Sequence, residues 1–494
     1  MSSRVRRVAV GGWAPPGELR RYLFGAAEYQ VWLDAGVAPS TSDASGRSYL
    51  GMGRGRVASA SVTHGIVTER IVSLGHQRNV DTTIFEYLRE NLHSPQIPPA
   101  EPPAHQEDSD SPPDYGVGFR LGWVGWLGYE WGAQTMGAPS ARATDVQEDI
   151  PDACFMYIDR AIECDHAAQR VFALSLDGDD DWVHEVTHAV AATSRQSSLP
   201  RETSRVLSAS LRHDHTAYES LIESCLAEIR AGNAYQLCLT NRIDLEFASP
   251  PDPFDVYDRL RSANPSHHGG LIVAGGVSLL SASPEVFLSV TPDGHATTKP
   301  IKGTRPRSAD ADVDAVLADE LRTNEKERAE NLMIVDLMRN DLGRVCEVGS
   351  VVVEKLFDVE SYASVHQLVS TVGGNLAAGI TAVDALAACF PAGSMTGAPK
   401  LSAMRILHEL EVGPRGIYSG AFGYLSLDGS CDFAMVIRSI VLHGSQGYIG
   451  TGGGITSGSV PRDEWEETLV KARPLLTALG ADLAGSPVDV PSAN

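Results

Sequence analysis

The sequence lacks the paired cysteines, the long apolar run and the excess of positive charge that define several common protein classes. Its seven cysteines are scattered along 494 residues, and no two of them form a C-x-x-C pair. Zinc sites and disulfide frameworks are therefore not indicated, and a reducing cytoplasm is the compartment that fits. No cysteine stands in a G-x-C-x-G turn either.

A membrane or nucleic acid is not expected as a partner. The most apolar segment, residues 269–282, is short and interrupted by glycines, whereas a membrane-spanning helix needs roughly 20 apolar residues. No continuous apolar stretch follows the basic residues near the start, so no signal peptide is expected. The formal net charge is −23, which argues against binding to polyanions. An anionic substrate would need a locally positive site.

The distribution of polar stretches indicates two regions and a tail. Residues 94–114 are proline-rich and acidic, which predicts a flexible surface loop within an N-terminal region, residues 1–205. Residues 206–482 carry the motifs described below, so we expect the catalytic chemistry there. Residues 483–494 are expected to form a tail.

Short turns between consecutive apolar segments predict antiparallel sheets. Residues 118–132 predict a strand pair, and residues 155–165 followed by 170–176 predict a hairpin. Periodicity predicts helices over residues 82–91, 183–194, 216–231, 324–342 and 462–479. Asn324 is the expected N-cap of the fourth helix, with Glu327 three residues on. The sequence therefore predicts an α+β fold, with antiparallel β-sheets in a sandwich flanked by helices.

Glutamates recur in pairs on the last two of these helices. Glu327 and Glu330 are spaced i, i+3, and Glu464 and Glu467 repeat this spacing, with Lys471 one turn further on. Either pair alone is also typical of a solvated helix face. If the two faces met, the carboxylates would repel by about 1–4 kcal/mol per pair. Protonation or a hard cation such as Mg²⁺ would relieve that repulsion.

Three further features indicate an anion site in the second region. Consecutive glycines at 452–454 follow an expected strand, and their N–H groups could hold a carboxylate or phosphate, or simply form a turn. Arg438 is expected on an otherwise apolar strand, where it needs an anionic partner from the protein or from a substrate. His366 lies in an apolar context that also fits a buried core histidine.

Two segments of small residues each contain a lysine. They are PIKGT at 300–304 and PAGSMTGAPK at 391–400. Small residues let the backbone approach a ligand, and a lysine can meet an anion or attack carbon. Both segments are also typical of ordinary loops.

Together these segments resemble the chorismate-utilising enzymes, which include anthranilate, aminodeoxychorismate, isochorismate and salicylate synthases. Eight motifs occur in the family's order: SPE (283–285), PIKGT (300–304), KERAENLMIVDLMRNDLGRV (326–345), VHQLVS (365–370), PAGSMTGAPK (391–400), IRSI (437–440), GTGGGI (450–455) and EWEETLVK (464–471). The resemblance is strongest over residues 216–480 and weaker in VWLDAG (31–36) and GWVGWLGYE (122–130). It implies the chorismate-binding fold of anthranilate synthase component I.

The resemblance also implies a magnesium site. Glu330 and Glu467 match the direct Mg²⁺ ligands of the family, and Glu327 and Glu464 match carboxylates that hold the metal's waters. In the family the metal binds the ring carboxylate of chorismate.

Other matched positions imply substrate contacts and catalysis. Glu285 matches a general acid aimed at the departing 4-hydroxyl. Ser394 and His366 match residues beside the reacting ring. The groups that match the binding site of the enolpyruvyl carboxylate are Tyr418, Arg438, Gly452, Gly453 and Gly454, with Lys471 close by.

Lys302 indicates the branch of the family. Anthranilate synthases usually have PIAGT, whereas PIKGT resembles the aminodeoxychorismate synthases, component I, which belong to the aminotransferases. There the lysine amine is thought to add at ring C2 before ammonia enters at C4. An ordinary lysine is only about one part in 2,500 neutral at pH 7, so this role requires a lowered pKa. Asn331 favours the same branch, because anthranilate synthases usually have His there. The water-activating lysine of salicylate and isochorismate synthases falls at Gln236.

The missing G-x-C-x-G turn predicts a partner. Ammonia in this branch comes from a glutamine amidotransferase whose cysteine nucleophile lies in such a turn, so we expect a separate subunit to supply it. VWLDAG departs from the LLES motif of tryptophan-regulated anthranilate synthases, so the sequence does not indicate inhibition by tryptophan, and it leaves open whether the N-terminal region has an effector site. The alternatives are anthranilate synthase component I and a non-catalytic homologue. The complete set of acid, metal and anion positions disfavours the non-catalytic homologue.

Overall fold

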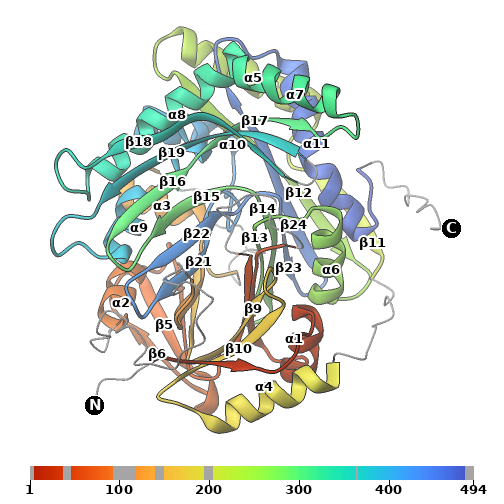
Figure 1. Ribbon diagram of the computed structural model, residues 1–494. Helices are drawn as coiled ribbons and strands as arrows, with labels where there is room; N and C mark the ends of the chain where they lie inside the picture. The colour runs from red at the N-terminus through yellow and green to blue at the C-terminus, as the bar shows by residue number, and fades with distance from the viewer. Residues whose placement is uncertain are drawn as a thin grey trace.

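Two large antiparallel sheets face each other and carry the helices on their outer surfaces. The computed structural model describes residues 5–36, 46–92, 118–139, 150–193, 204–362 and 365–483. Each sheet has twelve strands, and all strand pairs are antiparallel. In Figure 1, β13, β14, β23 and β24 lie on the right and β15, β16, β21 and β22 on the left. The prediction of an α+β sandwich is confirmed.

The first sheet, sheet A, joins strands from both ends of the chain. In spatial order it contains β1 (Val5–Val10), β10 (Arg170–Leu176), β9 (Arg160–Asp165), β3 (Arg47–Met52), β2 (Tyr29–Asp34), β13 (His268–Ala274), β14 (Val277–Ser283), β23 (Ser439–His443), β24 (Gln446–Ile455), β12 (Gln236–Phe247) and β11 (Val206–Leu211), with β20 (Gly397–Ala398) paired to β12.

The second sheet, sheet B, is built in the same mixed way. It contains β17 (Ile301–Pro306), β19 (Val365–Asn375), β16 (His295–Lys299), β15 (Val286–Val290), β22 (Cys431–Met435), β21 (Ala421–Ser426), β7 (Gly122–Leu127), β8 (Ala153–Ile158), β4 (Arg56–Ser61), β5 (Ile66–Ile71) and β6 (His76–Val80), with β18 (Val352–Ser361) paired to β19.

Helices cover the outer faces of both sheets. They are α1 (Pro16–Phe24), α2 (Ile84–Asn91), α3 (Tyr129–Met136), α4 (Asp180–Thr193), α5 (His215–Arg230), α6 (Pro253–Ala263), α7 (Ala311–Thr323), α8 (Glu325–Gly343), α9 (Ala382–Cys389), α10 (Lys400–Glu411) and α11 (Pro461–Leu479), with the short 3₁₀ turns η1 (Val72–Leu74) and η2 (Gly393–Met395). No helix in the described ranges is both long and apolar enough to cross a membrane.

The two regions distinguished in the sequence share both sheets. In sheet A, β2 pairs with β13, and in sheet B, β7 pairs with β21. The main apolar core includes the space between the sheets, where Met156 and Ile158 of sheet B and Ile272 of sheet A are fully buried. The two regions thus share one core, and the division near residue 205 stays a prediction from the sequence.

Several predicted elements are confirmed. The five predicted helices correspond to α2, α4, α5, α8 and α11 within a few residues at each end. Asn324 caps α8, since its side chain accepts a hydrogen bond from the Glu327 N–H at 3.1 Å. The expected loop at 94–114 and most of the expected tail lie outside the described residues.

Two strand predictions near the N-terminus are wrong. Residues 118–132 form one strand, β7, followed by helix α3, because Gly128 ends the strand and acts as the N-cap of the helix. Residues 155–165 belong to β8 and β9, which lie in different sheets. Only β9 and β10 form the predicted hairpin.

Glu130 on α3 is a buried acid that fastens the chain before β21. Its carboxylate accepts hydrogen bonds from the backbone N–H groups of Arg415 at 2.8 Å and Gly416 at 3.0 Å. Burial, followed by the nearby charge of Asp152, raises the pKa of Glu130 from 4.5 to about 7.

We expect this carboxyl group to make folding stability depend on pH. Between about pH 4.5 and pH 7 the folded protein keeps a proton that the unfolded chain has lost, so stability falls as pH rises through this window. Glu130→Gln keeps an acceptor for the two N–H groups but cannot titrate. From pH 5 to pH 8, wild type should lose about 2 kcal/mol more unfolding free energy than Glu130→Gln, measured by urea denaturation. Equal losses in the two proteins would contradict this assignment.

Candidate active site

One cavity of about 530 Å³ collects the motifs that are dispersed in the sequence. Of the fourteen residues singled out as candidates for the site, thirteen line it: Glu285, Lys302, Glu327, Glu330, Ser394, Tyr418, Arg438, Gly452, Gly453, Gly454, Glu464, Glu467 and Lys471. The exception is His366. The cavity therefore brings together acids, cations and a glycine-rich strand from distant parts of the chain.

Two crossings between the sheets form one wall of this cavity. The chain passes from β14 to β15 through Pro284 and Glu285, and from β22 to β23 through residues 436–438. The crossings are bonded to each other, because the Ala282 N–H donates to Arg438 O at 3.1 Å and the Met435 N–H donates to Glu285 O at 3.0 Å. Glu285 and Arg438 are thus held by two sheets at once.

Arg438 lies in a connection and not on a strand, contrary to the prediction. Its backbone has a φ of 52°, outside the range of a strand, which places it between β22 and β23. One guanidinium nitrogen donates to Lys471 O at 3.0 Å. Burial lowers the pKa of Arg438, and the neighbouring groups of Tyr418 and Glu467 offset part of this effect. No carboxylate of the described residues forms an ion pair with it, so it can accept an anion from outside.

The glycines at 450 and 452–454 lie within β24 and allow other groups to come close. A side chain at Gly450 would meet the Tyr418 ring at 1.9 Å, and one at Gly454 would meet the Gln236 amide at 2.6 Å and Lys302 Nζ at 3.5 Å. Beyond Ile449, β23 no longer pairs with β24, so one edge of the glycine segment faces away from β12 without a described strand partner. The glycines are therefore required for space as well as for backbone donors.

Lys302 is turned into the cavity by an irregularity in β17. Ile301 pairs with Val369 and Thr304 pairs with Gln367, so residues 302 and 303 bulge out of register. Gly303 has a φ of 85° and lies against Glu327, where a side chain would approach the carboxyl carbon to 2.8 Å. The lysine charge acts on Glu285, Glu330 and Glu467.

The two glutamate pairs face the same cavity, so the condition for repulsion between their carboxylates is met. Each carboxylate has a cationic neighbour: Glu327 lies 3.4 Å from Arg305, Glu330 lies 3.9 Å from Lys326, Glu464 lies 3.7 Å from Lys326, and Glu467 lies 2.6 Å from Lys471. Burial raises the pKa of Glu330 and of Glu464.

The carboxylates suit a hard cation in chemistry but are not gathered around one point. Within the described ranges, no group of three or more acid, histidine or cysteine side chains is placed to hold a metal. Carboxylate oxygens are the ligands that Mg²⁺ prefers, and it keeps several waters when bound. The donor set therefore fits Mg²⁺, provided that side chains now paired with lysine and arginine turn towards it.

Glu285 has the environment of a general acid. It is only 7% exposed. Burial raises its pKa, while the charges of Lys302 and Lys471 and a hydrogen bond with the Ser394 side chain offset part of this effect. A glutamic acid with a raised pKa keeps its proton closer to neutral pH, so it can donate one.

The prediction for His366 is wrong, because its side chain points away from the cavity. Its Nδ1 lies 2.8 Å from the Ser361 hydroxyl, and its Nε2 lies 2.9 Å from Asp314. The next residue on β19, Gln367, lines the cavity instead. Successive side chains of a strand point to opposite faces, which explains the difference of one position.

Gln367 lines the cavity and Gln236 lies beside Gly454 at its edge, and neither has a role in the sequence-based assignment. Both are buried, and neither the two amide atoms of Gln236 nor Oε1 of Gln367 has a hydrogen-bond partner among the described residues. The sequence carries no clear signal for Gln367, since polar and apolar residues occur on both faces of β19. Gln236 was distinguished only as a departure from another branch.

The two lysines of the small-residue segments have different surroundings. Lys302 lines the cavity, whereas Lys400 is buried and donates to Asp341 at 2.6 Å and to Cys389 O at 3.1 Å. Lys400 therefore fastens helix α10 to α8 and does not contact the cavity.

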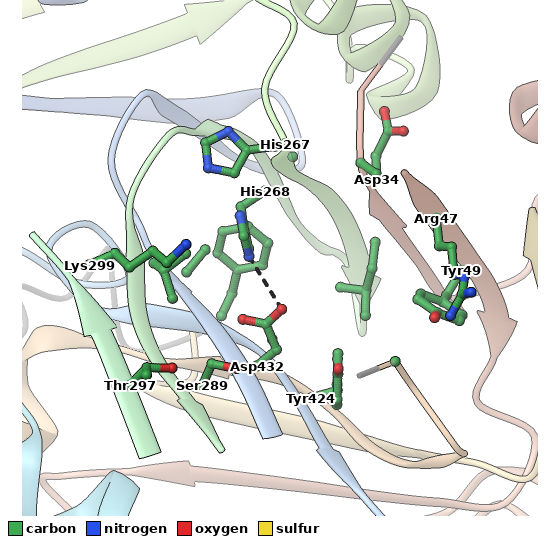
Figure 2. A pocket seen from close by; sticks show the side chains of 18 of the residues that line it. Asp34, Arg47, Tyr49, His267, His268, Ser289, Thr297, Lys299, Tyr424 and Asp432 are labelled. Carbon is green, nitrogen blue, oxygen red and sulfur yellow. Dashed lines mark hydrogen bonds and ion pairs between the residues drawn. The ribbon is translucent and has the colours of Figure 1, made fainter. Parts of the chain in front are cut away.

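A second cavity, of about 290 Å³, lies between the sheets (Figure 2). Asp34 and Tyr49 reach it from sheet A, and Asp432 reaches it from sheet B, with His268 3.3 Å from Asp432. Asp34 stands in the segment that departs from LLES, and its carboxylate already accepts from Arg261 at 2.7 Å and Ser48 at 2.9 Å.

Comparison with known proteins agrees with this arrangement. The family described as chorismate binding enzyme matches residues 53–477. An aminodeoxychorismate synthase of Streptomyces griseus is 40% identical over 94% of this chain and 64% of its own length. Anthranilate synthase component 1 of Streptomyces coelicolor is 39% identical over 73% of each chain. The crystal structure of anthranilate synthase component I from Streptococcus pneumoniae TIGR4 covers 89% of this chain and 94% of its own, with a TM-score of 0.71 and 29% identity.

The chain belongs to the chorismate binding enzyme family, because the match covers most of its length. It spans somewhat less than two thirds of the length of the Streptomyces griseus relative. The family assignment identifies the 530 Å³ cavity, in which the family's motifs meet, as the candidate active site.

The contrast between His366 and Gln367 gives a direct test of the geometry. We expect Gln367→Ala to lower kcat/KM by roughly tenfold to a hundredfold, since it removes an amide that faces the cavity and whose Oε1 has no partner among the described residues. His366→Asn should leave kcat/KM within about threefold and lower the melting temperature, because it disturbs only the contact with Asp314 and Ser361. The reverse pattern would contradict the placement of both residues.

Proposed function

We propose that this chain is an aminodeoxychorismate synthase, component I, which converts chorismate and ammonia to 4-amino-4-deoxychorismate and water. The observation that carries the proposal is the position of Lys302, which lies in the cavity with Glu285 among the groups its charge acts on. The relative of Streptomyces griseus has this activity in its name.

The chemistry needs one nucleophile and one acid on this chain. The neutral amine of Lys302 attacks ring C2, the two ring double bonds shift towards C4, and the 4-hydroxyl leaves as water with the proton of Glu285. Ammonia then attacks C4, the double bonds shift back, and the C2–N bond to Lys302 breaks. A proton from the incoming ammonia returns to Glu285, so both groups are restored.

The charge balance of the cavity supports a requirement for Mg²⁺. Five carboxylates line it (Glu285, Glu327, Glu330, Glu464 and Glu467), and so do five basic side chains (Lys302, Arg305, Lys326, Arg438 and Lys471). Chorismate would add two carboxylates, and a bound divalent cation would compensate for them. Glu330 and Glu467 would hold the ion directly, and Glu327 and Glu464 would hold its waters. The ion would bind the ring carboxylate and neutralise its charge.

The groups around Arg438 suit the enolpyruvyl carboxylate. Arg438 lacks a carboxylate partner among the described residues, and Tyr418 packs on Gly450 beside it. Lys471 Nζ donates to Gly452 O at 2.8 Å, which holds its charge at the glycine segment. These groups would orient C2 towards Lys302.

Ammonia would come from a glutamine amidotransferase that lies outside these 494 residues. The sequence contains no G-x-C-x-G turn that could carry the cysteine nucleophile of such an enzyme. We also propose a cytoplasmic location, which is supported by seven free, buried cysteines.

A second candidate is anthranilate synthase component I. The Streptomyces coelicolor relative of that name matches 73% of its own length, more than the aminodeoxychorismate synthase does. It would place the amine at C2 and release pyruvate, and it would need no amine from the protein at position 302.

The test is the product formed from chorismate, Mg²⁺ and a high ammonium concentration at mildly alkaline pH, identified by mass spectrometry. We expect a product that keeps the enolpyruvyl group and carries an amine in place of the 4-hydroxyl. Anthranilate with free pyruvate would contradict the proposal and support the second candidate.

Variants at position 302 separate charge from nucleophilicity. Lys302→Ala should lower the rate roughly a hundredfold or redirect the amine to C2, because the amine that attacks carbon is gone. Lys302→Arg keeps the positive charge but not a reactive amine, so it should be equally impaired. Near-normal activity of Lys302→Arg would show that only the charge matters.

A further inference from the structure

The metal-ligand candidates on α8 and α11 are joined by a single lysine. Lys326 Nζ lies 3.9 Å from Glu330 Oε1 on its own helix and 3.7 Å from Glu464 Oε1 on α11. Arg305 pairs with Glu327 and Lys471 pairs with Glu467, so each contacts one of the four glutamates. The charge of Lys302 also acts on Glu330 and Glu467, but it forms no ion pair with either carboxylate among the described residues. Of the three cations that do form ion pairs with these glutamates, only Lys326 joins carboxylates of both helices.

The two sides of this contact differ in their access to water. The Lys326 side chain is 57% exposed, whereas those of Glu330 and Glu464 are 13% and 6% exposed. A long lysine side chain can turn its ammonium into solvent with little loss of packing. The carboxylates cannot follow it, and without a cation they would repel each other in a partly buried place.

We propose that the ammonium of Lys326 occupies the place of the divalent cation in the metal-free protein and is expelled to solvent when the metal binds. This inference rests on the proposed function, because it assumes that Glu330 and Glu464 serve the metal. Lys326 keeps the two helices together before the metal arrives. The metal must replace it, so Lys326 weakens metal binding and keeps it reversible.

The arrangement also accounts for the separation of the carboxylates. No three acids of the described residues converge on one point, because their oxygens are engaged by cations that approach from different sides. Removing Lys326 should free Glu330 and Glu464 together. Removing a basic residue elsewhere on α8 should free neither of them.

The test is Mn²⁺ binding to the full chain without chorismate, measured from the electron paramagnetic resonance signal of free Mn²⁺. We expect Lys326→Met to lower the dissociation constant roughly tenfold, about 1.4 kcal/mol of binding free energy. Lys326→Arg should stay within about threefold of wild type, because it retains the charge. Arg339→Met is the matched control, since Arg339 is 51% exposed on the same helix and pairs only with Asp336.

The melting temperature of the same variant, measured with and without Mn²⁺, shows whether a change in binding arises from misfolding. Without metal, Lys326→Met should melt at a lower temperature than wild type, and saturating Mn²⁺ should remove the difference. Arg339→Met should show no such metal-dependent recovery.

The outcomes separate this inference from the proposed function. Glu330→Gln should abolish the site in wild type. If it does, and Lys326→Met binds Mn²⁺ with unchanged or weaker affinity, the role of Lys326 is overturned while the metal site stands. If wild-type binding does not depend on Glu330, both the metal site and the role of Lys326 are contradicted.

Discussion

The antiparallel pairing of β12 with β24 runs over ten residue pairs, from Leu237 with Ile455 to Glu246 with Gln446, and the active cavity is built against it. On the β24 side, glycines leave room for Tyr418, for the Gln236 amide and for Lys302. On the other side of β12, α5 and α10 pack through Tyr218, Ile222 and Leu407. A side chain at Gly450 or Gly454 would displace groups that the chemistry requires, so the ladder must present backbone alone.

Against this ladder, the fold places charges that are balanced before a substrate enters. Buried carboxylates are costly unless they are paired, protonated or bound to a cation. In the cavity Glu467 is paired with Lys471, Glu330 and Glu464 are paired with Lys326, and burial raises the pKa of Glu285. An acidic protein can thereby offer a dianionic substrate a locally favourable site.

The sequence was sufficient to predict the fold class and most of the residues that line the cavity, because helical spacing and motif order can be read directly from it. The prediction of Asn324 as the cap of α8 followed from such a local signal. The meeting of the two glutamate pairs did not, because helical spacing does not show which helices lie together. Local signals also did not show to which face of a strand a side chain points. His366 and Gln367 are neighbours on a strand with polar and apolar residues on both faces, so only the partner Asp314 on α7 shows which one points inwards.

Long-range connections were also hidden from the sequence. Arg438 was expected on a strand, because it directly follows the apolar residues 433–437, yet the chain changes sheets there. The pairing of β2 with β13 and of β7 with β21 joins residues more than 200 positions apart. Patterns within a short window contain no information on such partners.

Attack of the Lys302 amine on ring C2 of chorismate, as proposed above, would leave a covalent adduct that intact-protein mass spectrometry can detect. The chain would be mixed with chorismate and Mg²⁺ in the absence of ammonia, the reaction would be quenched with acid, and the mass of the intact protein would be measured. The account predicts a fraction of protein heavier by the mass of chorismate less one water, attached at Lys302 and absent from Lys302→Ala. An unmodified wild-type protein that nevertheless aminates chorismate at C4 at the normal rate when ammonia is added would contradict it.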